Sequence, residues 1–287
     1  MYLEGEGFSN LYIKLCKNVL TNGKTVSPRL MPTQEISGVT LKILNPRTRI
    51  LNKEVRNISL AFAIGEWLWC MSGREDLEMI KYYAPSYNKY SDDGLILNGA
   101  YGPRINRNLN KIIKLLQEDN NTRRAVIPIY SEKDVGLNSN DIPCTLCLQF
   151  MIRDNKLDMY TIMRSNDIYL GLPYDVFNFT MWQEYIACLL NINIGTYTHI
   201  VNSMHFYEKD RAKIIKAAEA KNILEYAMPE MPRTNIEYQI KRCIEIEEQL
   251  RKNLSYNYEK SDPFFQKLID ELIKYNQKKY EQMEIHK

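Results

Sequence analysis

The sequence of 287 residues has no apolar run of the ~18 to 20 residues that a membrane-spanning helix needs. Residues 1–10 lack the basic and apolar segments of a secretory signal peptide. The formal net charge is only +3, from 38 Lys and Arg against 35 Asp and Glu, so the chain lacks the strong positive charge of proteins that bind long nucleic acids. We therefore expect a cytoplasmic protein that acts neither on membranes nor on nucleic acid.

Histidine is scarce, with only three residues, at positions 199, 205 and 286. Six cysteines do not make a disulfide framework in a chain this long, and we expect them to be thiols in a reducing compartment. Cys144 and Cys147 match the second half of the zinc deaminase signature, but the His-x-Glu half is missing upstream. The remaining cysteines include no second closely spaced pair, so the sequence predicts no metal site.

The composition is that of an ordinary globular protein, with 45% hydrophobic and 25% charged residues. Apolar side chains recur at helical spacing in residues 8–19, 60–71 and 109–116, which predicts three helices. Residues 176–190 are apolar on nearly every face, and this pattern predicts a helix buried in the middle of the domain.

Runs rich in β-branched and aromatic residues predict strands over residues 125–130, 145–152, 157–163 and 196–207. The polar segment 153–156 between two of them predicts a hairpin turn. Beyond residue 208 the sequence changes to mixed-charge helices. We therefore predict one α+β domain, with a catalytic part over residues 1–210 and a helical C-terminal elaboration over residues 211–287.

Cys144 is the residue around which chemistry-bearing groups gather. A cysteine that stands alone is usually a small buried hydrophobic residue. Here Arg123 and Arg124 precede it and Arg164-Ser165 follows, and these guanidinium and hydroxyl groups suit a phosphate dianion. Because nearby cationic charge favours the thiolate, which is the nucleophile, the pattern predicts nucleophilic chemistry on a phosphorylated substrate.

At these positions the chain resembles the thymidylate synthase family. The resemblance covers roughly residues 8–210 and is carried by Pro143-Cys144, Gln149-Phe150, Arg164-Ser165-x-Asp167, Leu170-Gly171-Leu172-Pro173 and His205-x-Tyr207. It implies a thymidylate synthase-like fold, a mixed β-sheet with packed helices, in an obligate homodimer formed through the sheet face. It also implies a reaction without metal, in which a cysteine adds to carbon 6 of a pyrimidine nucleotide and carbon 5 takes a one-carbon unit from 5,10-methylenetetrahydrofolate.

Three departures from the synthase pattern indicate a branch of that family. Where synthases have Pro-Cys-His this chain has Cys144-Thr145, where they have Ser-Cys-Asp it has Asn166, and where they have Asn it has Asp175. Together these changes resemble the cytidylate hydroxymethylases, which act on CMP or dCMP. In that branch water adds to the exocyclic methylene, whereas a synthase reduces it by hydride.

The chemistry of the bases supports this branch. Uracil presents an N–H and a carbonyl, which the amide of an asparagine can satisfy. Cytosine presents a bare ring nitrogen and an amino group, so the carboxylate of Asp175 can accept from the amine, whereas against uracil it would oppose acceptor to acceptor. The alternative is that Asp175 caps a helix beginning near Val176, a common role for aspartate.

The resemblance implies a role for each remaining site residue. The catalytic residues would be Cys144, Glu66, Asp175 and Tyr101; the substrate-binding residues Arg29, Arg123, Arg124, Arg164, Ser165, Asn166, His205 and Tyr207; and the folate-binding residues Asp167 and Glu66. Arg123 and Arg124 would reach the phosphate from the neighbouring subunit. Glu66 is the only charge in an apolar segment, and such surroundings suit a carboxyl to proton transfer.

Structural roles compete with these assignments. Arg29 has the alternative of a solvated loop arginine, Glu66 that of an ion pair within a helix, and the pair His205 and Tyr207 that of an ordinary strand end. Two other functions also remain open at this point. One is a synthase or hydroxymethylase acting on uridylate, and the other is a non-catalytic module that binds nucleotide or RNA.

Overall fold

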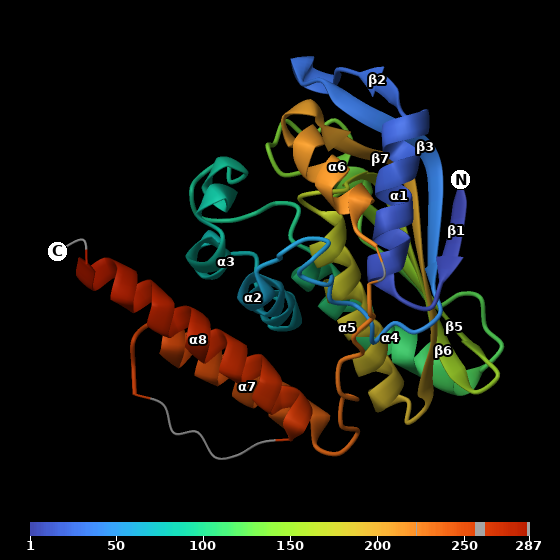
Figure 1. The fold of residues 1–287 in the computed structure, drawn as a ribbon. Helices are drawn as coiled ribbons and strands as arrows, with labels where there is room; N and C mark the ends of the chain where they lie inside the picture. Colours follow the sequence, from blue (N-terminus) through green and yellow to red (C-terminus); the bar gives the residue numbers. More distant parts are fainter. Residues whose placement is uncertain (222, 256–261, 286–287) are drawn as a thin grey trace. The chain divides into compact units, whose positions relative to one another are not determined.

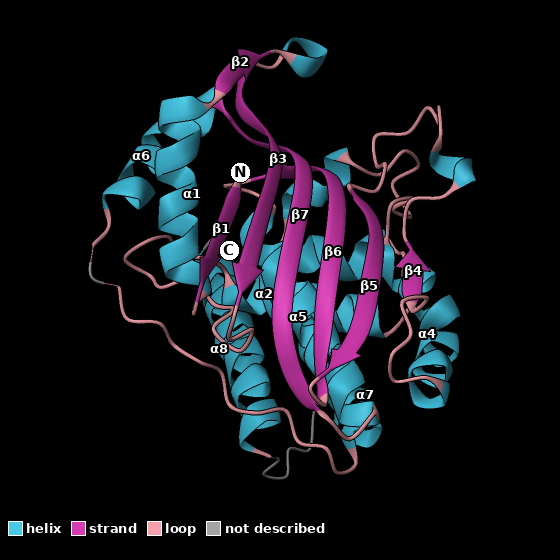
Figure 2. Ribbon diagram, turned by 90° about the vertical axis from the view of Figure 1, so that its right-hand side faces the viewer, coloured by secondary structure: helices cyan, strands magenta, loops and turns pink. Residues whose placement is uncertain are grey.

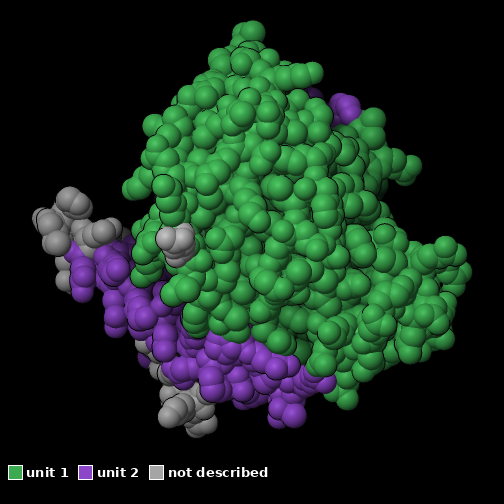
Figure 3. All heavy atoms as spheres, turned by 45° about the vertical axis from the view of Figure 1, so that its right-hand side comes forward, with its two compact units in different colours: residues 1–58, 108–135, 143–228 green, residues 59–107, 136–142, 229–287 purple. Residues whose placement is uncertain are grey.

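The computed structural model describes residues 1–221, 223–255 and 262–285. The chain divides into two compact units, shown in two colours in Figure 3. The first consists of residues 1–58, 108–135 and 143–228, and the second of residues 59–107, 136–142 and 229–287. The predicted boundary at residue 210 falls inside the first unit, so the compact units do not follow the predicted division of the chain.

The first unit is built on a seven-stranded sheet (Figure 2). Its strands are β1 (Tyr2–Gly5), β2 (Lys24–Val26), β3 (Thr33–Ile43), β4 (Val126–Pro128), β5 (Thr145–Arg153), β6 (Lys156–Asp167) and β7 (Asn193–Tyr207). The strand order is β1-β3-β7-β6-β5-β4, with β2 paired to β3. The pairs β1/β3 and β6/β7 are parallel and the others antiparallel, which confirms the predicted mixed sheet in an α+β fold.

The hairpin between β5 and β6 forms at the predicted turn. Asp154 and Asn155 adopt positive φ angles of 48° and 55°, the left-handed conformation that these short polar side chains tolerate. The hairpin pairs Thr145 with Met163. It therefore brings the segment just before β5, which carries Cys144, beside the end of β6.

Helices cover the sheet of the first unit. They are α1 (Phe8–Asn22), α5 (Leu172–Leu189), α6 (Arg211–Glu219) and the C-terminal part of α4 (Tyr101–Glu118), whose N-terminal turns belong to the second unit. Helix α5 packs against β6 and β7 and is buried along nearly its whole length, as its sequence predicts (Figures 1 and 2). Inside it, Glu184 accepts hydrogen bonds from Arg47 and Arg49, which pair its buried charge.

Two helix boundaries differ from the prediction. Helix α5 begins at Leu172, four residues before the predicted start, because Pro173 is favourable in the first turn of a helix. Helix α4 begins at Tyr101, eight residues before the predicted start, so the polar segment ahead of residue 109 is partly helical. The first difference moves Asp175 from the expected cap position into the first turn of α5.

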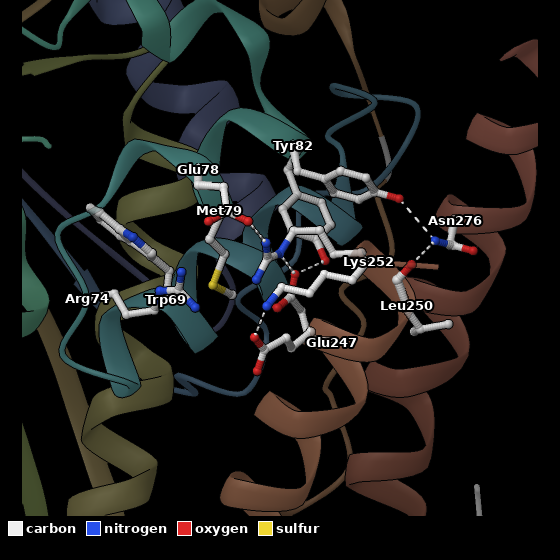
Figure 4. Close-up of polar contacts among 12 residues, drawn as sticks. Trp69, Arg74, Glu78, Met79, Tyr82, Glu247, Leu250, Lys252 and Asn276 are labelled. Carbon is white, nitrogen blue, oxygen red and sulfur yellow. Dashed lines mark hydrogen bonds and ion pairs between the residues drawn. The ribbon is translucent and has the colours of Figure 1, made fainter. Parts of the chain in front are cut away.

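The second unit is helical, with α2 (Leu60–Met71), α3 (Leu77–Tyr83), α7 (Ile236–Arg251) and α8 (Pro263–Ile285). Helix α2 has the predicted bounds, and the Ser59 side chain caps it by accepting from the N–H of Phe62. Figure 4 shows Asn276 of α8 between Tyr82 and Leu250, donating to the hydroxyl of one and the carbonyl of the other. None of the helices described is long and apolar enough to cross a membrane.

A buried ion pair within α7 contacts two residues of α3 in this unit. The side chains of Arg251 and Glu247 are 4% and 1% exposed and lie 3.0 Å apart. The hydroxyl of Tyr83 also donates to Glu247, and Arg251 reaches Glu78 as well. The buried carboxylate of Glu247 is therefore stabilised by two donors, Tyr83 and Arg251.

Replacing Arg251 by alanine should lower the free energy of unfolding by about 3 to 5 kcal/mol, because it leaves the buried carboxylate of Glu247 without its counter-charge. Urea unfolding followed by far-UV circular dichroism measures this. Lys252→Ala is the matched control, since it removes an exposed pair with Glu248 one residue along and should cost about 1 kcal/mol or less. Equal losses of unfolding free energy in the two variants would contradict the claim that the buried pair contributes more than the exposed one.

Candidate active site

The segment carrying Cys144 is joined to Arg164 by two hydrogen bonds. The backbone N–H of Arg164 donates to the carbonyl of Cys144 at 2.9 Å, and its side-chain Nε donates to the carbonyl of Pro143 at 2.9 Å. These bonds follow from the antiparallel pairing of β5 with β6. They hold Arg164 against the segment that carries the half-buried thiol.

Ser165 and His205 meet across the parallel pair β6/β7. The hydroxyl of Ser165 lies 3.5 Å from Nδ1 of His205, and the rings of His205 and Tyr207 contact edge to face with centroids 5.5 Å apart. All three side chains are partly exposed. The structure therefore groups three of the predicted substrate-binding residues at the end of these two strands.

The buried side chain of Asn166 and the half-buried side chain of Asp175 form a hydrogen-bonded pair. Nδ2 of Asn166 donates to Oδ2 of Asp175 at 2.8 Å. Burial raises the pKa of the Asp175 carboxyl to about 7, although the hydrogen bond from Asn166 acts in the opposite direction. A Cβ atom added at Gly171 would lie 2.9 Å from Nδ2 of Asn166 and 3.2 Å from Oδ2 of Asp175, so the pair needs glycine at that position.

The interpretation of Asp175 as a helix cap is wrong. The N-cap of α5 is Gly171, and no side chain caps that helix. Asp175 lies inside the first turn, with its carboxyl hydrogen-bonded to a side chain from β6 instead of to the backbone of its own helix. A half-buried carboxyl without a capping role needs another reason to be there.

The two carboxylate oxygens of Asp167 differ in their hydrogen bonding. Its Oδ1 accepts from the N–H groups of Tyr169 and Leu170, at 2.7 and 2.9 Å. Its Oδ2 is buried and has no hydrogen-bond partner among the residues that the structure describes. Burial raises the pKa of this carboxyl. An acceptor held rigidly on one side and left open on the other is suited to an N–H donor of a ligand.

Three predicted arginines lie apart from this group. Arg123 and Arg124 precede β4 and have exposed side chains, and Arg29 lies in the exposed turn Pro28–Leu30 with a φ of 51°. The exposed position of Arg29 agrees with the alternative interpretation, a solvated loop arginine.

Glu66 and Tyr101 belong to the second unit. Glu66 is half-buried in α2, and its Oε1 accepts from the hydroxyl of Tyr87 at 2.8 Å. The ring of Tyr87 packs edge to face on Phe62, which holds this hydroxyl in place. Tyr101 is half-buried at the first residue of α4. The only carboxyl of the apolar helix α2 is thus held by a phenol from the following 3₁₀ turn, Pro85–Lys89.

Sequence reasoning missed two residues that contact the site. The rings of Tyr197 and His199 are fully buried in β7, with the Tyr197 hydroxyl 2.8 Å from Nδ1 of His199. Nε2 of His199 lies 2.9 Å from Oδ1 of Asn166. The sequence signal that could have found them is the alternation of buried and exposed side chains along β7, which places Tyr197, His199 and Val201 on the buried face of the strand.

Arg56 was also missed. Its guanidinium carbon lies 4.1 Å from the ring centroid of Tyr169 and 5.5 Å from that of Tyr174. Its Nε and Nη1 atoms are buried and have no hydrogen-bond partner in the described part of the chain. Arg56 follows Val55 in an irregular loop, and no periodic pattern marks it.

No group of three or more His, Cys, Asp and Glu residues in the described ranges could hold a metal ion. A cavity of about 480 Å³ lies in the second unit, lined in part by Tyr82, Arg251 and Lys279. None of the predicted site residues lines it. The chemistry-bearing residues of the first unit are thus grouped on the sheet and α5, and the cavity is a separate feature of the helical unit.

Comparison with known proteins identifies the family. Residues 10–279 match the family model described as thymidylate synthase. The chain belongs to the thymidylate synthase family. This confirms the family to which Pro143-Cys144, Arg164-Ser165-x-Asp167 and His205-x-Tyr207 pointed, and the mixed sheet with its helices agrees with that fold.

Similar members of the thymidylate synthase family include phage enzymes. A deoxyuridylate hydroxymethyltransferase of Bacillus phage SP01 is 31% identical over 220 residues, covering 70% of this chain and 57% of that protein. One of Pseudomonas phage M6 is 33% identical over 189 residues, covering 63% of this chain and 54% of that protein. A putative thymidylate synthase of Methanocaldococcus jannaschii is 26% identical over 204 residues, covering 69% of this chain and 87% of that protein. The chain spans little more than half the length of the two phage relatives.

Proposed function

We propose that the protein transfers a one-carbon unit from methylenetetrahydrofolate to carbon 5 of a cytidine monophosphate, CMP or dCMP, and that water completes a hydroxymethyl group. Membership of the thymidylate synthase family supports folate-dependent transfer to a pyrimidine nucleotide. The names of the two phage relatives support hydroxymethyl transfer. The observation that carries the choice of cytosine is the hydrogen bond between Asn166 and Asp175.

The first unit supplies the groups that bind the nucleotide and begin the reaction. We assign the nucleophile to Cys144, whose thiolate adds to carbon 6 of the base. Arg164 and Ser165 bind the phosphate as charged and neutral donors, and His205 and Tyr207 bind the sugar. The support is geometric, since the bonds of Arg164 to the Pro143 and Cys144 carbonyls hold its charge beside the thiol.

Asp175 is assigned to the base. Oδ2 is occupied by the donor of Asn166, so Oδ1 is the oxygen left to accept from the exocyclic amine of cytosine. When sulfur adds to carbon 6, electron density moves to ring nitrogen 3, and a neighbouring carboxyl stabilises the proton gained there. Such a carboxyl serves cytosine at both stages of the addition.

Asp167 fits the folate. Its orphaned Oδ2 is an acceptor that a bound N–H group would complete, and the two backbone N–H bonds to Oδ1 hold it rigid. Methylenetetrahydrofolate supplies the one-carbon unit when bound. Glu66 is assigned to proton transfer, oriented by the hydroxyl of Tyr87, and Tyr101 to assistance in removing the proton from carbon 5.

A homodimer is part of the proposal. Arg123 and Arg124 present exposed guanidinium groups ahead of the short strand β4. Exposed arginines in one chain are able to complete a phosphate site in another, and an Arg164 already fixed by backbone carbonyls leaves the phosphate with further oxygens to bind. In this assignment each site takes two arginines from the neighbouring subunit.

Uridylate is the second candidate substrate, and a specific observation favours it as well. Two relatives are named for deoxyuridylate, and the pKa of Asp175 near 7 leaves a large protonated fraction at neutral pH. With Oδ2 held by Asn166, a protonated Oδ1 offers a donor that complements the carbonyl of uracil. The protonation state of Asp175 therefore determines whether its carboxyl complements cytosine or uracil.

The test is a product assay. The purified protein is incubated with methylenetetrahydrofolate and with CMP, dCMP, UMP or dUMP in turn, and each product is identified by its mass. We expect hydroxymethylated cytidylate without the absorbance of dihydrofolate. Methylated deoxyuridylate accompanied by dihydrofolate would identify a synthase and overturn the proposal.

The preference for cytidylate over uridylate should rise as pH increases through about 7. Because burial raises the pKa of Asp175 to about 7, the carboxyl is neutral below that pH and ionised above it. The ionised form repels the uracil carbonyl but still accepts from the cytosine amine. Of the groups connected to Asp175 through Asn166, His199 stays neutral and Tyr197 stays protonated in this range, because burial lowers the pKa of the first and raises that of the second. Values of kcat/KM for dCMP and dUMP from pH 6 to 8.5 measure the ratio, and a flat ratio would contradict this role.

A further inference from the structure

A continuous row of hydrogen bonds runs through the buried core behind Asp175. It begins at the Tyr197 hydroxyl, passes through both ring nitrogens of His199, and reaches Asp175 through the amide of Asn166, with lengths of 2.8, 2.9 and 2.8 Å. Tyr197 and His199 are 0% exposed and Asn166 is 4% exposed. Because these groups are buried, their polar atoms need partners within the protein, and the Tyr197 hydroxyl has the side chain of Thr161 beside it as well as His199.

The row has a direction. Burial lowers the pKa of His199 to about 3, so its ring is neutral and carries one donor and one acceptor. Burial raises the pKa of the Tyr197 phenol well above its ordinary value, so it keeps its proton. The NH₂ group of Asn166 donates to Asp175, so its Oδ1, which only accepts, faces Nε2 of His199. Nε2 therefore carries the ring hydrogen, and Nδ1 is left to accept from the phenol.

We propose that Tyr197 and His199 are positioning residues, which hold the amide of Asn166 with its NH₂ group toward Asp175 and thereby help to set the choice of pyrimidine base. This inference rests on the proposed function. Neither residue touches the base in this assignment. Both act through Asn166, so their effect appears in selectivity more than in the rate of the chemical steps.

The reversed row shows why the direction matters. If the amide turned over, its oxygen would face Asp175, and only a protonated carboxyl could then donate to it. His199 would have to carry its hydrogen on Nδ1 and donate to the oxygen of Tyr197. The tautomer of His199 and the role of Asp175 as an acceptor are thus coupled through two hydrogen bonds that share the amide of Asn166, and such networks act cooperatively.

The first experiment is Tyr197→Phe, which keeps the ring and removes the donor that fixes the tautomer. We expect the ratio of kcat/KM for dCMP to that for dUMP to fall about tenfold, the effect of one unpaired buried polar group. Tyr12→Phe is the matched control, because it removes a fully buried tyrosine hydroxyl elsewhere in the first unit. It should leave the ratio unchanged. An unchanged ratio in Tyr197→Phe, or equal falls in both variants, would overturn the proposal.

The second measurement is independent of turnover. The chain has only three histidines, so the ring nitrogens of a ¹⁵N-labelled protein are resolvable by NMR, and a His199→Gln spectrum assigns the signals of His199. We expect a neutral ring with hydrogen on Nε2 that does not titrate between pH 5 and 8. Hydrogen on Nδ1, or titration in this range, would overturn the inference. If neither nucleotide is converted, the proposed function is wrong. The NMR measurement of the His199 tautomer still tests whether the row of hydrogen bonds exists.

Discussion

Replacing Cys144 by alanine should lower kcat for either pyrimidine nucleotide by about 10⁴-fold or more, because it removes the sulfur that adds to carbon 6. Nucleotide binding should survive, since Arg164 and Ser165 remain and the carbonyl of residue 144, not its side chain, accepts the bond from Arg164. Product formation measured by mass spectrometry and nucleotide affinity measured by calorimetry separate the two effects.

Cys147→Ala is the matched control for that substitution. Cys147 is also half-buried, lies three residues along the same segment, and has a thiol whose pKa is raised by burial. A thiol of that kind is a poor nucleophile, so the variant should keep most of the activity. Turnover that survives in Cys144→Ala but is lost in Cys147→Ala would exchange the roles of the two cysteines. Survival in both would revive a non-catalytic nucleotide-binding module.

The local elements of the fold could be predicted from the sequence because their signals are local. Helix α2 forms over the predicted residues, since one run of apolar side chains ends at a serine and a glycine. The β5/β6 hairpin forms because Asp154 and Asn155 accept positive φ angles. The start of α5 was missed because the apolar run that marks the helix begins at Val176, after a first turn that contains Tyr174 and Asp175.

Pairing between distant strands left no comparable signal. Strand β3 pairs with β7 although more than a hundred residues separate them. No sequence pattern in either strand identifies the other as its partner. The same holds for the site. Cys144, Arg164 and Asp175 were predicted from linear motifs, whereas His199 joins Asn166 only through the register of β7 beside β6. A contact that depends on register appears only when the sheet is assembled.

Asp175→Asn should shift the ratio of kcat/KM for dCMP to that for dUMP about 100-fold toward dUMP. The carboxylate offers the base only acceptors, whereas an amide offers a donor that the carbonyl of uracil can accept. Each buried polar mismatch costs about 1 to 3 kcal/mol, and the substitution removes one for uracil while creating one for cytosine. The same assay of both nucleotides across pH should also show that the ratio no longer changes near pH 7.

Asp158→Asn is the control, because it makes the same carboxyl-to-amide change on β6, where Asp158 accepts from the backbone and hydroxyl of Thr196. It should alter stability without altering the ratio. If Asp175→Asn instead lowered turnover of both nucleotides equally, its carboxyl would serve only to hold Asn166. The choice of base would then have to come from Asn166 itself, whose amide is the other polar group of this pair, and the cytidylate assignment would lose its physical basis.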